Sequence, residues 1–212
     1  MPRVKTRRPY DSSRRQQQAR QRRAAILEVA WRLFRADGYA GTTIASIAAE
    51  AGVSVETIYK TFGSKPRVLA AVADAALAGP DAAPTMRRSD EMGARETDPY
   101  TIVESWATFA CEVTPRLAPV VLLIQSAATA SSELTELLAR LDAERLDRMA
   151  HQARLLKRRG YLRAGVTLKE ARDAMWAYTD PGMYELLVLR QKWPLDRFRE
   201  FLANALTAAL LP

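Results

Sequence analysis

The stretch that decides the fold is GTTIASIAAEAGVSVETIYKTFGSKPRVL, residues 41–69. Its first apolar residues recur at the i, i+3, i+4 spacing of one helical face: Ile44, Ile47 and Ala48. Gly52 stands where a left-handed residue ends a helix, and Ser54 is placed to cap the next one. The pattern therefore predicts two short helices, residues 42–50 and 55–61, joined by a tight turn in a helix-turn-helix.

The second predicted helix has an inward and an outward face. Ile58 and Phe62 are four residues apart and face inward. The outward positions include threonine, valine and tyrosine, which are poor helix formers on a surface that only has to be soluble. These side chains suit DNA, because a threonine methyl can meet a thymine methyl and a tyrosine hydroxyl can donate to a phosphate.

The run AGVSxxTIYxxFxSK, residues 51–65, resembles the N-terminal DNA-binding domain of the TetR family of bacterial transcriptional regulators. The matching positions are Gly41, Thr43, Ile47, Ala48, Ala51, Gly52, Val53, Ser54, Thr57, Tyr59, Phe62, Ser64, Lys65 and Leu69. Pro66 departs from the family, which commonly has Glu there, but proline is accepted in the first turn of a helix. The resemblance is dense over residues 20–70 and much less specific in the C-terminal half.

This resemblance implies a two-fold homodimer that presents two recognition helices to successive major grooves of a palindromic operator on double-stranded DNA. We expect base contacts from Val55, Glu56, Thr57, Lys60 and Thr61. Phosphate contacts are expected from Thr42, Thr43, Tyr59 and Lys65, where the family has a phosphate-touching lysine at the position of Lys65. Two interpretations of Glu56 stay open: it accepts from a cytosine amino group, or it only favours the start of the helix.

The net charge of +8 belongs to the N-terminal third. Residues 1–70 carry 14 Lys and Arg against 5 Asp and Glu, and the remainder carries 18 against 19. This is the distribution of a phosphate-binding module joined to a neutral one. A single cysteine excludes an internal disulfide, and the absence of an apolar run of about 18 residues argues against a membrane partner. We expect a cytoplasmic, nucleoid-associated protein.

The predicted fold class is all-α: an N-terminal three-helix helix-turn-helix DNA-binding domain and a C-terminal helical ligand-binding and dimerisation domain. Residues 1–13 are expected to be a disordered basic arm, residues 14–63 the DNA-binding domain and residues 64–212 the second domain. The arm is either a solvated tail or a segment that follows the DNA backbone or minor groove. Arginines crowd the start of the first helix, residues 14–36, where they oppose the helix dipole and suit phosphate contact.

The C-terminal half alternates apolar helical stripes with breaks. A loop is expected over residues 79–98 because of its prolines, glycines and mixed charges. The helices expected after residue 64 cover 64–77, 99–113, a segment from Pro115 or Pro119 to 128, 132–159 and 167–178. A further helix is expected from Met183 to its end at Trp193-Pro194, followed by a last one through Phe198 and Ala209. In the resembling family the last two helices pair with their symmetry mates, so we expect the homodimer to form there.

A small-molecule effector of unknown identity is implied by the same resemblance. The candidate ligand residues combine aromatic and polar side chains on apolar helices, as ligand cavities do: Trp106, Phe109, Gln125, Ser126, Thr129, Met149 and Trp176. All of them are also ordinary core residues, and a Trp or Met at helical spacing is more often a core residue than a ligand contact.

The sequence gives weaker support to two alternative functions. An enzyme is not expected, because Cys111 and His151 stand alone and no phosphate loop, zinc motif or nucleophile elbow is present. We therefore expect no catalytic residue, metal site or cofactor. A non-specific nucleoid-type DNA-binding protein would explain the basic arm, but it would have no use for the large neutral second half.

Overall fold

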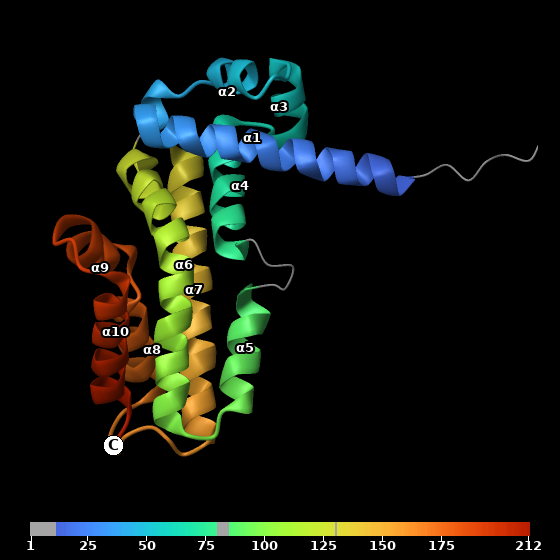
Figure 1. Cartoon of the computed structure of the whole chain (residues 1–212). Coiled ribbons are helices and arrows are strands. Elements are labelled where there is room, and N and C mark those ends of the chain that lie inside the picture. Colours follow the sequence, from blue (N-terminus) through green and yellow to red (C-terminus); the bar gives the residue numbers. More distant parts are fainter. Residues whose placement is uncertain (1–11, 80–84, 130) are drawn as a thin grey trace, which may run out of the picture. The chain divides into compact units, whose positions relative to one another are not determined.

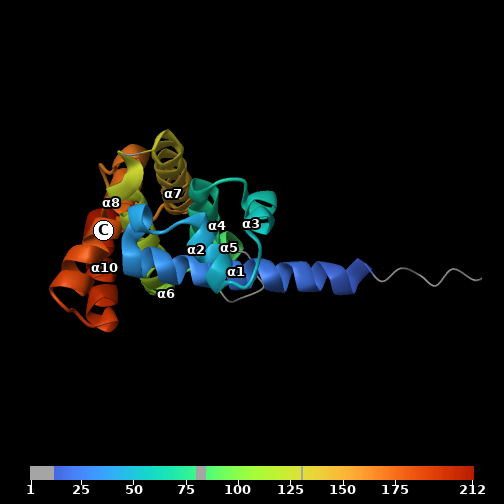
Figure 2. The ribbon, with the colours of Figure 1, turned by 90° about the horizontal axis from the view of Figure 1, so that it is seen from above.

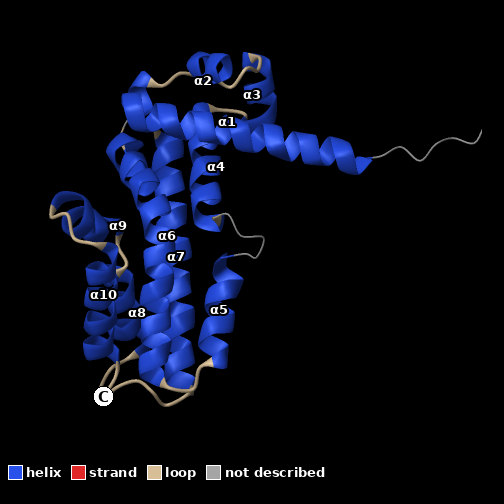
Figure 3. Ribbon diagram, viewed as in Figure 1, coloured by secondary structure: helices blue, strands red, loops and turns tan. Residues whose placement is uncertain are grey.

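The computed structural model describes residues 12–79, 85–129 and 131–212, and these residues form helices and no strand (Figure 3). The all-α prediction is therefore confirmed for the described part of the chain. The predicted arm lies outside it up to residue 11. The chain divides into two compact units, Met1–Val68 and Leu69–Pro212, which we describe separately.

The N-terminal unit contains α1 (Ser12–Gly41), α2 (Ile44–Glu50), α3 (Val55–Phe62) and the start of α4 (Lys65–Ala78). Figures 1 and 2 show α2 and α3 as short helices beside the long α1. The first helix was expected to end at residue 36, but α1 continues beyond a kink at Gly38, which has a φ of 69° and is followed by a second helical segment. The buried apolar side chains of this unit are Ile26, Leu27, Ala30, Phe34, Ile44, Ile47, Ala48, Ile58, Phe62 and Val68.

Beyond α4, the described residues of the C-terminal unit form further helical elements. These are α5 (Thr85–Arg95), α6 (Pro99–Ala128), α7 (Ser132–Arg158), α8 (Leu168–Tyr178), α9 (Pro181–Tyr184), η1 (Glu185–Arg190) and α10 (Leu195–Leu210). The long helices α6 and α7 pack together, α8 packs on α7, and α10 packs on α6 (Figure 1). Asp98 and Thr167 cap α6 and α8 by accepting from the Thr101 and Glu170 backbone N–H groups.

One helix replaces the two that were expected between residues 99 and 128. Pro115 and Pro119 both lie inside α6, so the carbonyls of Cys111 and Pro115 lose their helical N–H partners. Apolar side chains on both sides of the prolines are buried, including Val113 and Val120, and this packing outweighs the lost bonds. By length and composition α6 is also apolar enough to cross a membrane, but its apolar side chains form the core of this unit.

The expected loop over residues 79–98 contains α5, which was not predicted. Contacts from other helices hold this segment. Arg88 pairs with Glu112 of α6 at 2.7 Å, and the Arg159 guanidinium donates to the carbonyls of Gly93 and Glu96 at 3.0 and 2.6 Å. The composition of this segment indicated a loop. The residues that hold it as a helix lie far away in the sequence, so the segment itself carries no sign of them.

The helix expected from Met183 to Trp193-Pro194 is split between α9 and the π-helical turn η1, which ends at Arg190. Its last backbone bond runs from the Gln191 N–H to the Leu186 carbonyl at 3.1 Å, a five-residue step. Tyr184 is buried against Phe198 of α10. Leu186 and Leu189 remain 50% and 38% exposed.

Candidate nucleic-acid interface and C-terminal cavity

Short polar side chains fix both helices of the helix-turn-helix. Thr43 and Ser46 form a reciprocal capping box at the start of α2, with both N–H to Oγ distances at 3.0 Å. Gly52 in the turn has a φ of 64°, a value that favours glycine. Ser54 caps α3 by accepting from the Thr57 N–H at 3.1 Å. These bonds confirm the predicted caps and set the angle at which α3 is presented.

The two faces of α3 differ as predicted. Ile58 and Phe62 are buried, whereas Val55 and Tyr59 are 41% and 51% exposed. The exposed residues of this helix are Val55, Glu56, Tyr59, Lys60 and Thr61. Exposing the apolar surface of a valine or a tyrosine to water is unfavourable, so their exposure on a capped helix is typical of a binding surface.

The threonine hydroxyls of α3 are already hydrogen-bonded. Thr57 is half-buried, and its Oγ1 lies 2.8 Å from the Ser54 Oγ. The Thr61 hydroxyl donates to the Thr57 carbonyl at 2.7 Å. These hydroxyls therefore serve the helix, and contact of the threonine methyl groups with thymine stays a prediction.

Thr42 does not fit the predicted phosphate contact. Its side chain is fully buried, and its hydroxyl donates to the Gly38 carbonyl at 2.8 Å. A buried hydroxyl with a satisfied proton has no access to a phosphate, so Thr42 instead closes the turn between α1 and α2. Thr43 is exposed, and its backbone and side chain belong to the capping box.

Lys65 has an internal role that the sequence did not indicate. Its ammonium donates to the Tyr39 and Thr42 carbonyls at 2.8 and 2.9 Å and lies 4.1 Å from the centre of the Tyr39 ring. Burial without a counter-charge lowers the pKa of this amine. Lysine has three N–H donors, so one remains for a phosphate after the two carbonyls are bound.

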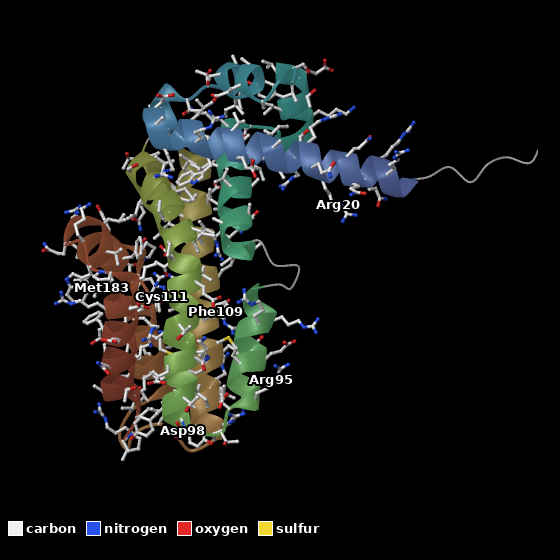
Figure 4. All side chains as sticks on the ribbon, viewed as in Figure 1. Arg20, Arg95, Asp98, Phe109, Cys111 and Met183 are labelled. Atoms are coloured by element: carbon white, nitrogen blue, oxygen red, sulfur yellow. The ribbon has the colours of Figure 1, made fainter. Side chains whose placement is uncertain are left out.

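Arginines line the first turns of α1. Arg14, Arg15, Arg20, Arg22 and Arg23 are all exposed, and the first turn contains no acidic residue. Figure 4 shows Arg20 extending from this helix. Arg23 also lies over the Phe62 ring, 5.3 Å from its centre, which brings one positive charge next to α3.

The C-terminal unit contains a cavity of about 370 Å³ among its helices. Three predicted ligand residues line it: Trp106, Phe109 and Met149. Phe109 leaves α6 toward α5, where Arg88 lies 5.8 Å from the ring centre, and Cys111 leaves α6 toward the cluster around Tyr184 (Figure 4). Most of the remaining lining is apolar, as in cavities that hold small organic ligands.

The other four predicted ligand residues lie outside this cavity. Gln125, Ser126 and Thr129 are exposed at the end of α6, and the Ser126 hydroxyl donates to the Leu123 carbonyl at 2.8 Å. The prediction placed these residues in a cavity because the segment that ends at residue 128 is apolar, but the last turns of α6 are exposed on this side. Trp176 packs its ring against the Arg145 guanidinium, 4.6 Å away, and is not part of the lining.

Sequence reasoning missed Arg148 and Gln152 of α7. Both line the cavity, Gln152 is 6% exposed, and the Arg148 side chain is 10% exposed. Arg148 and Gln152 are four residues apart on α7 and therefore share one face of the helix, and Gln152 lies three residues after the predicted ligand residue Met149. Polar residues recurring within an apolar stripe were the signal that would have found them.

The isolated histidine and cysteine occupy different surroundings. His151 is half-exposed, with its Nε2 atom 3.3 Å from the Asp90 carboxylate. Burial raises the pKa of the Cys111 thiol to about 11. Within the described ranges, no cluster of three or more His, Cys, Asp or Glu side chains could hold a metal ion.

Comparisons with known proteins show similarity at two levels. The sequence profile of the bacterial regulatory proteins of the tetR family matches residues 26–72, and a comparison with curated proteins gives no match. The SmeT–triclosan complex is 24% identical, covering 90% of this chain and 92% of that one with a TM-score of 0.72.

Two further structures show the same fold. A TetR-family regulator from Syntrophomonas wolfei is 19% identical, with coverage of 90% and 96% and a TM-score of 0.73. The regulator FadR from Bacillus subtilis, in complex with stearoyl-CoA, is 17% identical, with coverage of 88% and 98% and a TM-score of 0.71.

Proposed function

Because the chain carries the TetR-family DNA-binding domain at residues 26–72 and the fold of TetR-family transcriptional regulators, we propose that it is a ligand-responsive repressor. It binds a palindromic operator as a homodimer and leaves it when a small molecule occupies the C-terminal cavity. We further propose a cytoplasmic, nucleoid-associated protein with a basic arm at residues 1–13, a DNA-binding domain at 14–63 and an effector domain at 64–212.

The exposed face of α3 carries this proposal. Val55, Glu56, Tyr59, Lys60 and Thr61 stand in water on a helix that is capped and buried on its other face. In the major groove Val55, Glu56, Lys60 and Thr61 would meet base edges, whereas Tyr59 and Thr43 would reach the phosphates. Thr57 contributes its methyl group, and Lys65 contributes its remaining N–H.

Exposed leucines near the end of the chain support a homodimer. Leu186, Leu189 and Leu195, in η1 and α10, are 50%, 38% and 41% exposed. Large exposed apolar side chains gathered in neighbouring elements are typical of surfaces that bind a partner. A two-fold axis here would provide the second α3 that a palindromic operator requires.

Ligand control is supported by the cavity of about 370 Å³. SmeT was solved with triclosan and FadR with stearoyl-CoA, so proteins with this fold bind small molecules of different chemistry. A ligand in the cavity shifts the balance between DNA-binding and non-binding conformations only by the difference of its affinities for the two.

Selection of random duplex DNA on the purified protein tests the proposal. We expect an inverted repeat with half-sites about one helical turn apart, recovered at about physiological salt. Lys60→Gln, which changes one exposed residue of α3, should alter the recovered half-site. A pool that stays random with both proteins would contradict sequence-specific repression and favour a non-specific nucleoid-type protein.

A further inference from the structure

One guanidinium at the edge of the cavity has an unused hydrogen-bond donor. The Arg148 side chain is 10% exposed, and its Nη1 atom donates to the Asp90 carboxylate at 2.6 Å. Its Nη2 atom is buried and has no hydrogen-bond partner among the described residues. A buried donor without an acceptor costs free energy, so an acceptor brought in by a ligand would relieve that cost.

Arg148 also joins the main cavity to a second one of about 270 Å³. Trp106, Arg148 and Gln152 line both spaces. The charged residues of the second cavity are Asp90, Arg148 and Arg158, together with His151. Two guanidinium groups against one carboxylate make this end favourable for an anion.

The other charged residues of the main cavity already have partners. Arg145 pairs with Asp142 at 3.4 Å and with Asp180 at 3.1 Å. Glu144 pairs with Arg140 at 2.9 Å. Among the described cavity residues with a buried polar atom, Arg148 is therefore where an incoming group finds an open donor.

We propose that the effector is an amphipathic monocarboxylate. Its apolar body lies in the main cavity against Trp106, Phe109 and Met149, and its carboxylate accepts from the Arg148 Nη2 atom beside Gln152. Carboxylates are strong acceptors for guanidinium groups. This inference rests on the proposed ligand control, and it adds the chemical class of the ligand.

Calorimetric titration of the full chain without DNA tests this chemistry. The probes are hexanoate, decanoate and 4-phenylbutyrate, with 1-decanol and decyltrimethylammonium as neutral and cationic matches, all below micelle-forming concentrations. We expect at least one carboxylate to bind. The alcohol of the same chain length should bind more weakly, and the cation should not bind.

Three variants separate ligand binding from structural effects. Arg148→Gln should weaken carboxylate binding by about tenfold to a hundredfold, because a charge-assisted hydrogen bond is lost. Arg154→Gln changes an exposed arginine of the same helix and should leave binding unchanged. Asp90→Asn removes the competing carboxylate and should leave binding equal or tighter, whereas it would weaken binding if the ion pair served only to hold α5.

Several results would overturn the inference. It fails if none of the carboxylates binds, if the alcohol or the cation binds as tightly, or if Arg148→Gln retains full affinity with an unchanged circular dichroism spectrum. Because this titration contains no DNA, its failure leaves operator selection as an independent measure of the repressor function.

Discussion

Lys65→Met separates an internal role of this lysine from a DNA contact. In the folded protein the ammonium donates to the carbonyls of Tyr39 and Thr42 at 2.8 and 2.9 Å. Its Nζ atom also lies over the Tyr39 ring, 4.1 Å from the ring centre. Methionine keeps most of the chain length and its apolar contacts but removes the charge and all three donors. The change therefore isolates the bridge from the packing.

The expected loss of stability follows from these contacts. Two hydrogen bonds from a charged donor contribute about 1.5 kcal/mol each at the low end of their range, and the ring contact adds about 0.5 kcal/mol. Lys65 is only partly buried, and its lowered pKa shows that burying its charge has a cost. Allowing for both, we expect a loss of about 2 kcal/mol, or about 4–8 °C in the unfolding midpoint for a chain of this size.

Thermal unfolding followed by circular dichroism measures this loss, with Lys60→Met as the control. Lys60 is exposed on α3, so its replacement should leave the midpoint nearly unchanged while weakening operator binding. Lys65→Met should lower both. An unchanged midpoint for Lys65→Met, with operator affinity reduced as much as in the control, would refute the internal role and leave phosphate contact as the function of Lys65.

Three further predictions concern DNA specificity, acid stability and thiol reactivity. Thr57→Ala should relax the sequence preference at one operator position, because its methyl contact is lost; competition between operators that differ at single base pairs measures this. Hydrogen bonds from Thr101 lower the pKa of the Asp98 carboxylate below its ordinary value of 3.8. The stability that these bonds add is therefore fully present above pH 3.8, and it is lost as the pH falls through the lower pKa of the folded protein. Asp98→Asn keeps a capping side chain and should flatten the dependence of the unfolding midpoint on pH between about 5 and 2. Cys111 should react with iodoacetamide at pH 8 about a hundredfold more slowly than a thiol with a pKa of 9.0, because burial raises its pKa to about 11; mass spectrometry of timed samples follows the alkylation, and reaction at the rate of a free thiol would contradict this burial.

The helix-turn-helix was predictable because the signals that form it are local. Ser54 is three residues from the N–H that it caps, and Gly52 adopts its positive φ within the turn itself. The apolar spacing that places Ile58 and Phe62 on the inward face is also contained within one helix. Each of these effects acts over four residues or fewer, so the printed order of residues is enough to find them.

The errors arose where distant contacts outweigh local preferences. Prolines and mixed charges indicated breaks, yet α6 continues through Pro115 because packing on both sides stabilises it. The segment of α5 is held by Arg159, more than sixty residues away in the sequence. Thr42 was predicted to contact DNA. Its burial was not visible in the sequence, because it depends on how the chain turns from α1 into α2 near Gly38.

The sequence by itself determined the helix-turn-helix, the faces of α3 and the concentration of positive charge in the N-terminal third, since these depend on spacing and composition. Only the tertiary structure decided which side chains line the cavity. It excluded Gln125 from the lining and placed Arg148 there with an unpaired donor. The reason is physical: hydrogen-bond satisfaction and burial are properties of groups brought together from separate helices, and no single helix contains that information.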